Sequence, residues 1–188
     1  MATITAEDKK TGVKASIIVR RPSWKNVLAG YPIYRDILKD IDMPSDMVFK
    51  SIFGENYNTN IYHNACATRV SIALLKSNVT IDKVEGVILT EVTYGELKGK
   101  KVILAADGME IWLEKKWGIS EFKIIKPGSI DKVNAEFSGK KGIYVMRPID
   151  QSLEGFGATG HCTLWIGDGV IGEHYAKKAY YVRLWELK

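Results

Sequence analysis

The sequence predicts an α+β fold in which helices come first and antiparallel strands follow. Residues 64–75 carry apolar side chains at the i, i+4, i+7 and i+8 positions of one helical face. Residues 160–186 instead combine strand-forming runs with glycine turns. The chain has 188 residues, 46% of them hydrophobic, which suffices for one domain with its own core. We therefore expect a single domain over residues 1–188, with a helical N-terminal part and C-terminal antiparallel strands.

The composition argues against several kinds of partner. No apolar run approaches the roughly 20 residues that span a bilayer, so we expect no membrane insertion. Residues 1–10 contain no apolar signal core, so we expect synthesis in the cytoplasm without a signal peptide. The net charge of +5 comes with lysines spread along the chain, which indicates no nucleic-acid partner. The 2 cysteines and 3 histidines lack metal-ligand spacing, so we expect no metal and no cofactor.

The first part of the chain predicts an extended arm followed by helices. Residues 1–22 are polar with one short apolar run, which favours an extended arm. Ser23 is a candidate cap for a helix that closes near Gly30. Apolar residues at helical spacing predict a second helix over residues 33–41, and residues 47–53 predict a third, which ends at a glycine.

The next stretch contains the most informative residue of the chain. Residues 55–63 are polar and predict a loop that lies over the start of the following helix. Asn64 is a good candidate for the cap of that helix, which places Cys66 in its first turn. His63 precedes Cys66 by three residues, but its position in a loop favours a surface residue.

Caps, glycines and prolines mark the remaining elements. Asp107 is the expected cap of the longest of these helices, and the Gly167-Asp168-Gly169 segment marks a hairpin turn. In chain order we expect strands 86–89 and 101–104, a helix from Asp107 to Gly118, a helix from Ser129 to about Phe137, a strand over 142–146, a hairpin over 160–175 and a last strand over 179–186.

Cys66 is a candidate nucleophile because of its expected position. A thiol in the first turn of a helix lies at the positive end of the helix dipole, which favours the nucleophilic thiolate. The alternative is that Cys66 is a small core residue, since free cysteine is among the most buried residue types.

His161 is the candidate partner of Cys66, at the start of the predicted hairpin. We expect a three-residue turn in this glycine segment to set Glu173 opposite His161, and a turn of two or four residues to set His174 there. We favour Glu173, because a carboxylate both orients an imidazole and stabilises its protonated form. Cys162 alternates to the other face of the strand and is expected in the core.

Together these residues predict nucleophilic amide chemistry. Helices that carry a nucleophile, followed by antiparallel strands that begin with a histidine, are typical of a papain-like peptidase core. In such a core Cys66 attacks an amide carbonyl, His161 protonates the leaving amine, and Glu173 holds the ring. Backbone N–H groups at the helix start then stabilise the oxyanion.

Two motifs resemble a known family. The segment NACATRVSIAL at 64–74, followed by TGHCTLW at 159–165, resembles the fourth family of type VI secretion amidase effectors, which are NlpC-type papain-like cysteine peptidases. Residues 24–32 and the helix ending at Gly118 also resemble this family, so the likeness covers most of the chain.

The resemblance implies an antibacterial toxin that the type VI apparatus injects into the periplasm of a rival cell. It implies cleavage of the amide between D-glutamate and meso-diaminopimelate in peptidoglycan stem peptides, and inhibition by a cognate immunity protein. Cys66 and His161 carry over directly, and Glu173 takes the third position. The chain departs from the family at Thr163, where an Asp is common, and at Glu173, where an Asp is expected.

Two other functions fit the same residues. One is a different papain-like amide reaction, such as deamidation or transglutamination of a protein. The other is a non-catalytic binding module in which Cys66 is merely buried. Arg69, one turn after Cys66, is a candidate ligand for a substrate carboxylate, although an exposed helix arginine is the simpler interpretation.

Overall fold

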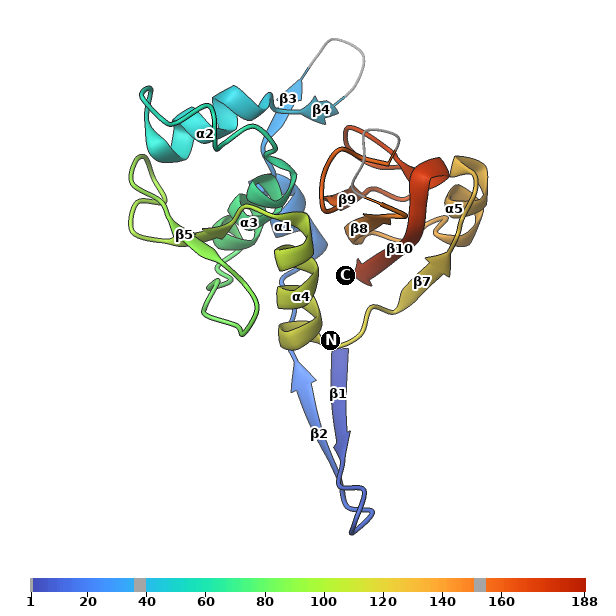
Figure 1. Ribbon diagram of the computed structural model, residues 1–188. Coiled ribbons are helices and arrows are strands. Elements are labelled where there is room, and N and C mark those ends of the chain that lie inside the picture. Colours follow the sequence, from blue (N-terminus) through green and yellow to red (C-terminus); the bar gives the residue numbers. More distant parts are fainter. Residues whose placement is uncertain (1, 36–39, 151–154) are drawn as a thin grey trace.

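The structure, a computed structural model, confirms the α+β prediction and describes residues 2–35, 40–150 and 155–188. Figure 1 shows helices α1, α3 and α4 on one side of the sheet that the last strands form. The elements are β1 (Ala2–Glu7), β2 (Lys14–Val19), α1 (Trp24–Gly30), β3 (Ile33–Arg35), β4 (Asp40–Asp42), α2 (Ser45–Phe53), α3 (Cys66–Lys76), β5 (Leu89–Glu91), β6 (Lys101–Ile103), α4 (Ala106–Trp117), β7 (Phe122–Ile125), α5 (Ile130–Glu136), β8 (Gly142–Pro148), β9 (His161–Trp165), the 3₁₀ helix η1 (Ala176–Lys178) and β10 (Ala179–Glu186).

The central sheet has the strand order β7-β10-β8-β9, and every neighbouring pair is antiparallel. Its residues are rich in β-branched and aromatic side chains, which suit a pleated, buried surface. In the β8–β9 pair Val145 lies opposite Cys162 and Met146 lies opposite His161. Strand β9 is therefore an edge strand, and its first residue is a histidine.

Both faces of this sheet are covered, because successive residues of a strand point to opposite sides. One face contributes residues such as Val145, Cys162 and Leu164 to a core shared with α1, α3 and α4. The other face contributes residues such as Tyr144 and Trp165 to a core shared with α5 and η1. The first core fixes the start of α3 against β9, which positions the site described below.

A third apolar cluster attaches α2 to the outer side of α3. Phe49 and Ile52 of α2 pack with Ile72 of α3 and Val102 of β6. Residues 54–65 return from α2 to the start of α3 without helix or strand, as predicted for that loop. His63 in this loop is exposed, which confirms the expected surface position.

Several predicted elements are confirmed. Ser23 caps α1, with its side chain accepting a hydrogen bond from the Asn26 N–H. Gly54 follows α2 and Gly118 follows α4, each as the C-cap residue. Ser129 caps α5, and the last strand runs over the predicted residues.

Other predictions are wrong. The predicted helix over 33–41 is instead the antiparallel pair β3–β4, and its residues Ile37 and Leu38 lie outside the described residues. Prolines on both sides leave room for only a short element there, and β-branched isoleucines favour strands. Asp107 lies inside α4, which is preceded by Ala105 as the N-cap. Strand β5 begins at Leu89 rather than at residue 86, and no prediction was made for β7.

The N-terminal residues form an antiparallel hairpin, in which Ala2 pairs with Val19 and Glu7 with Lys14. Figure 1 shows this hairpin projecting from the rest of the chain. Where the predicted arm was simply extended, the structure thus contains a two-stranded sheet. Within residues 2–35, 40–150 and 155–188, no helix is long and apolar enough to cross a membrane.

Candidate active site

Cys66 is the first residue of α3 and lines a pocket at that end of the helix. The N-cap residue is Ala65, and no side chain caps the helix, so the prediction of Asn64 as the cap is wrong. Asn64 lies one position too early, because the helix begins only after Ala65. The N–H groups of the first turn are therefore not occupied by a capping side chain, and they can donate to an oxygen atom of a ligand.

The rest of α3 is unusually buried. Every residue from Cys66 to Leu74 is buried, because α3 packs on β9 on one side and under α2 on the other. Cys66 is 8% exposed. The expectation that Cys66 is a core residue and the expectation that it is a nucleophile are thus compatible, since its sulfur atom borders both the core and the pocket.

Cys162 lies against Cys66, on the face of β9 that packs on α3. The sequence placed Cys162 in the core, and it is fully buried. Its thiol donates a hydrogen bond to the Cys66 sulfur, and this bond lowers the pKa of Cys66 more than any other contact. Burial of Cys162 raises its own pKa, so it remains the protonated partner. This contact was not predicted.

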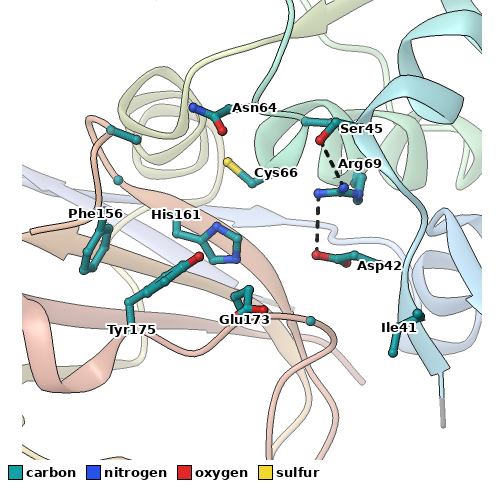
Figure 2. A pocket seen from close by; sticks show the side chains of 14 residues that line it. Ile41, Asp42, Ser45, Asn64, Cys66, Arg69, Phe156, His161, Glu173 and Tyr175 are labelled. Carbon is teal, nitrogen blue, oxygen red and sulfur yellow. Dashed lines mark hydrogen bonds and ion pairs between the residues drawn. The ribbon is translucent and has the colours of Figure 1, made fainter. Parts of the chain in front are cut away.

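His161 is the second neighbour of the Cys66 sulfur. Its hydrogen bond and its charge add to the effect of Cys162, and together they hold the pKa of Cys66 well below the usual value although burial acts in the opposite direction. Because β9 is the edge strand, the ring of its first residue can turn around the edge toward α3. Figure 2 shows the His161 ring beside the Cys66 sulfur, so the structure brings the two predicted residues together.

Glu173 lines the same pocket as His161, whereas His174 does not. The His174 ring packs against Tyr144 and Trp165, and its Nδ1 accepts a hydrogen bond from the Ala176 N–H. Burial lowers the pKa of His174, so it is a poor partner for a protonated imidazole.

The hairpin turn differs from the prediction on which Glu173 was chosen. Trp165 pairs with Val170 and the Ile166 N–H donates to the Gly169 carbonyl at 2.8 Å, so the turn consists of residues 167 and 168 rather than of three residues. Continued pairing in this register would set His174 opposite His161. The pairing instead ends near Gly172, whose positive φ of 77° bends the chain, and Glu173 reaches the pocket from a loop.

A further carboxylate in the pocket belongs to Asp42 of β4. Its Oδ1 accepts a hydrogen bond of 2.8 Å from the Tyr31 hydroxyl, and its Oδ2 pairs with Arg69 at 3.5 Å. The Tyr31 oxygen also lies 3.1 Å from the hydroxyl of Thr163, which donates to the Ile171 carbonyl at 2.7 Å. Sequence reasoning missed Asp42, because it lies well before Cys66 in the chain and directly after a segment predicted as helical.

Arg69 is buried, so the interpretation as an exposed helix arginine is wrong. Its Nε and Nη2 both donate to the Met43 carbonyl, at 2.9 and 2.6 Å. Its Nη2 also donates to the Ser45 hydroxyl at 3.4 Å, as the dashed lines of Figure 2 show together with the Asp42 pair. These contacts use most of its donors, so Arg69 holds the β4–α2 connection beside α3 rather than offering a free guanidinium.

Cys66 lies where two pockets meet. The first, of about 410 Å³, contains His161 and the charged residues Asp42, Arg69 and Glu173. The second, of about 300 Å³, is lined by apolar and aromatic residues, among them Phe49, Tyr62 and Leu104. A chain that crosses Cys66 therefore has a charged pocket on one side and a more apolar pocket on the other. Over the described residues, no three His, Cys, Asp or Glu side chains are grouped as metal ligands.

This arrangement suits attack on a carbonyl carbon. It combines a thiol with a strongly lowered pKa, an imidazole in contact with it, and helix N–H groups without a capping side chain. These are a nucleophile, a proton donor and an oxyanion site. The open cleft on both sides of Cys66 admits an extended substrate.

Comparison with known families gives a match over more than half of the chain. Residues 62–185 match the family described as type VI secretion system (T6SS), amidase effector protein 4, or Tae4. This range includes Cys66, His161 and Glu173. No curated protein matches the chain.

Solved structures show the same fold. The Tae4 effector from Enterobacter cloacae is 20% identical, covers 92% of this chain and 100% of its own, and superposes with a TM-score of 0.69. Tae4 from Salmonella typhimurium, in complex with the immunity protein Tai4 from Enterobacter cloacae, is 23% identical. It covers 89% of this chain and 100% of its own, and superposes with a TM-score of 0.69. A chain of the Tae4–Tai4 complex from Salmonella Typhimurium is 22% identical, covers 90% of this chain and 100% of its own, and superposes with a TM-score of 0.67.

Proposed function

The chain belongs to the type VI secretion system amidase effector protein 4 family, and we propose that it is a cysteine amidase that cuts peptidoglycan stem peptides. The proposed bond is the amide between D-glutamate and meso-diaminopimelate. The observation that carries this proposal is the contact between the Cys66 thiol and His161 at the bottom of an open cleft, in a chain of an amidase family.

The reaction begins with the thiolate of Cys66, beside the protonated ring of His161. The sulfur attacks the carbonyl carbon of the D-glutamyl residue, and the carbonyl π-electrons move to the oxygen. The N–H groups at the start of α3 stabilise this oxyanion, because the helix has no side-chain cap. Burial of the sulfur strengthens each of these electrostatic contacts.

His161 then gives its proton to the leaving nitrogen as the C–N bond breaks, and diaminopimelate leaves with a free amine. A water molecule, deprotonated by His161, hydrolyses the thioester on Cys66 and releases the D-glutamyl carboxylate. His161 belongs to the charged pocket and not to the apolar one. The leaving diaminopimelate segment is therefore assigned to the charged pocket, and the D-glutamyl segment to the side of Phe49 and Tyr62.

Glu173 is proposed as the third member of the site. Its carboxylate lines the pocket beside the His161 ring, where it can accept a hydrogen bond from the imidazole and hold the orientation of the ring. Because Glu173 lies in a loop, its carboxylate is held less rigidly than that of a strand residue would be.

Delivery and inhibition follow from the family. As a type VI secretion effector, the protein is secreted into target cells, and the proposed place of action is their periplasm, where peptidoglycan lies. The related Enterobacter and Salmonella effectors were solved with the immunity protein Tai4. By analogy, a cognate immunity protein is proposed to cover the cleft around Cys66.

We further propose that the whole chain acts as one amidase domain. The candidate site combines Asp42 from β4 with Cys66 of α3 and His161 of β9. The two halves of the chain are also tied by a hydrogen bond of 2.7 Å from the Trp24 N–H to the Lys188 carbonyl.

The test is mass spectrometry of soluble peptides released from diaminopimelate-type sacculi. We expect the wild-type protein to create new ends between D-glutamate and diaminopimelate. Cys66→Ser, which keeps the shape of the side chain, and His161→Ala should both release nothing while unfolding as cooperatively as the wild type. Cleavage at another bond would reject the proposed specificity, and equal release by Cys66→Ser would reject the nucleophile.

A further inference from the structure

The imidazole of His161 has an unused nitrogen. Its Nε2 atom is buried and has no hydrogen-bond partner, while the ring contacts the Cys66 sulfur. In Figure 2 one ring nitrogen points toward the sulfur and the other toward the side of the pocket where Asp42 and Glu173 lie. A buried ring N–H without an acceptor is unfavourable, so one of these carboxylates should receive it when the site is occupied.

We propose that Asp42 is a positioning residue of this site, a second carboxylate that holds the His161 ring and stabilises its protonated form from the side of β4. This inference rests on the proposed function and adds a residue to it. The ring then lies between a loop carboxylate, Glu173, and a carboxylate from a different part of the chain.

The carboxylate of Asp42 is held more firmly than that of Glu173. Its two oxygen atoms bind the Tyr31 hydroxyl and the Arg69 guanidinium, and its side chain is 15% exposed. Burial raises the pKa of Asp42, whereas the charges of Arg69 and His161 lower it. Asp42 thus places a negative charge within electrostatic reach of the His161 ring, in the same pocket.

The backbone at Gly172 supports this role. A Cβ atom added there would lie 2.7 Å from the Asp42 Cγ, so the Asp42 carboxylate already fills the space of a side chain at this position. Gly172 directly precedes Glu173, and its φ of 77° also disfavours any other residue. The carboxylate from β4 thus occupies a place that a side chain of the hairpin loop would otherwise take.

The titratable and charged side chains around His161 come from several elements. They are Cys66 and Arg69 of α3, Asp42 of β4, Glu173, His174 and Tyr175 of the loop after β9, and Cys162 of β9 itself. Among the groups named, Asp42 and Glu173 are the two carboxylates that line the pocket together with His161.

The test uses iodoacetate, which needs no cell-wall substrate. The Cys66 thiolate attacks the CH₂ carbon of this anionic reagent and displaces iodide. The reaction is faster while the neighbouring ring is protonated, so the alkylation rate falls again at alkaline pH and gives a bell-shaped profile. Asp42→Asn should move the alkaline limb to lower pH by about one unit, because a nearby opposite charge is lost. Asp42→Glu should restore most of that shift. Tyr31→Phe, which frees the carboxylate oxygen but keeps every charge, should shift the limb by less than half of this.

An unchanged alkaline limb in Asp42→Asn would overturn the inference, and so would an equal shift in Tyr31→Phe, which would indicate a packing effect. If Asp42→Asn does not fold, Glu173→Gln decides. An alkaline limb that moves by less than about one pH unit without Glu173 leaves the ring held by a second carboxylate and supports the inference, whereas a larger shift assigns the ring to Glu173 alone and rejects it. A protein that shows the expected bell but releases nothing from sacculi would refute the proposed substrate while leaving the role of Asp42 intact.

Discussion

Removing the Cys162 thiol should raise the pKa of Cys66. The Cys162 thiol is the strongest influence that lowers this pKa, ahead of His161, and it donates directly to the Cys66 sulfur. Cys162→Ala deletes the donor. The thiolate of Cys66 then loses a hydrogen bond, while its burial, which disfavours the charge, remains.

The magnitude follows from the strength of the lost bond. A hydrogen bond to a charged group contributes about 1.5–3 kcal/mol, and a thiol is a weak donor, so we take about 1 kcal/mol. At about 1.36 kcal/mol per pKa unit, the pKa of Cys66 should rise by about 0.7 unit. On the acid side of the profile this corresponds to about a fivefold slower alkylation. Loss of the buried sulfur atom should also lower the free energy of unfolding by about 1–2 kcal/mol.

The assay is the rate of alkylation by neutral iodoacetamide between acid and neutral pH, read by intact mass. Cys162→Ser is the matched control, because serine keeps a donor and nearly the same volume. Its curve should stay closer to the wild type than that of Cys162→Ala, and Cys66→Ala in each background gives the rate of any other site. Coincident curves for wild type and Cys162→Ala would refute the reasoning. An equal shift in both variants would mean that packing, and not the donor, sets the pKa.

Three further predictions concern the elements that hold the site. Arg69→Met removes the donors to the Met43 carbonyl and the cation that pairs with the buried carboxylate of Asp42, so urea unfolding should show a loss of about 3–5 kcal/mol. Ser71 both donates to the Ile103 carbonyl and accepts from its N–H, so Ser71→Ala should cost about 1–3 kcal/mol by the same measurement, more than an exposed serine would. Ser129→Ala removes the cap of α5, and thermal unfolding should show a loss of about 1 kcal/mol, with alkylation of the nucleophile unchanged.

Local sequence signals were sufficient for much of the fold. Ser23 at the start of α1 and Gly118 at the end of α4 were predicted correctly, whereas Asp107 is not the cap of α4. The β3–β4 segment failed because its apolar spacing fits a helix, whereas its two short strands pair with each other, with Ile33 opposite Asp42. The hairpin after His161 failed in its register, since a glycine-rich turn accommodates either two or three residues.

The site separates into a part that one sequence reveals and a part that only the folded chain reveals. A cysteine at a helix start and a histidine at a strand start are visible, because each belongs to a local pattern. The contacts that set the chemistry of Cys66 are not local, since Cys162 and Asp42 reach the site from β9 and β4. Glu173 was predicted from a turn that does not form, yet it lines the pocket because the chain bends at the preceding glycine. A carboxylate near His161 was therefore foreseeable from the chemistry of an imidazolium, whereas the segments that supply it follow from how β4 and the loop after β9 meet.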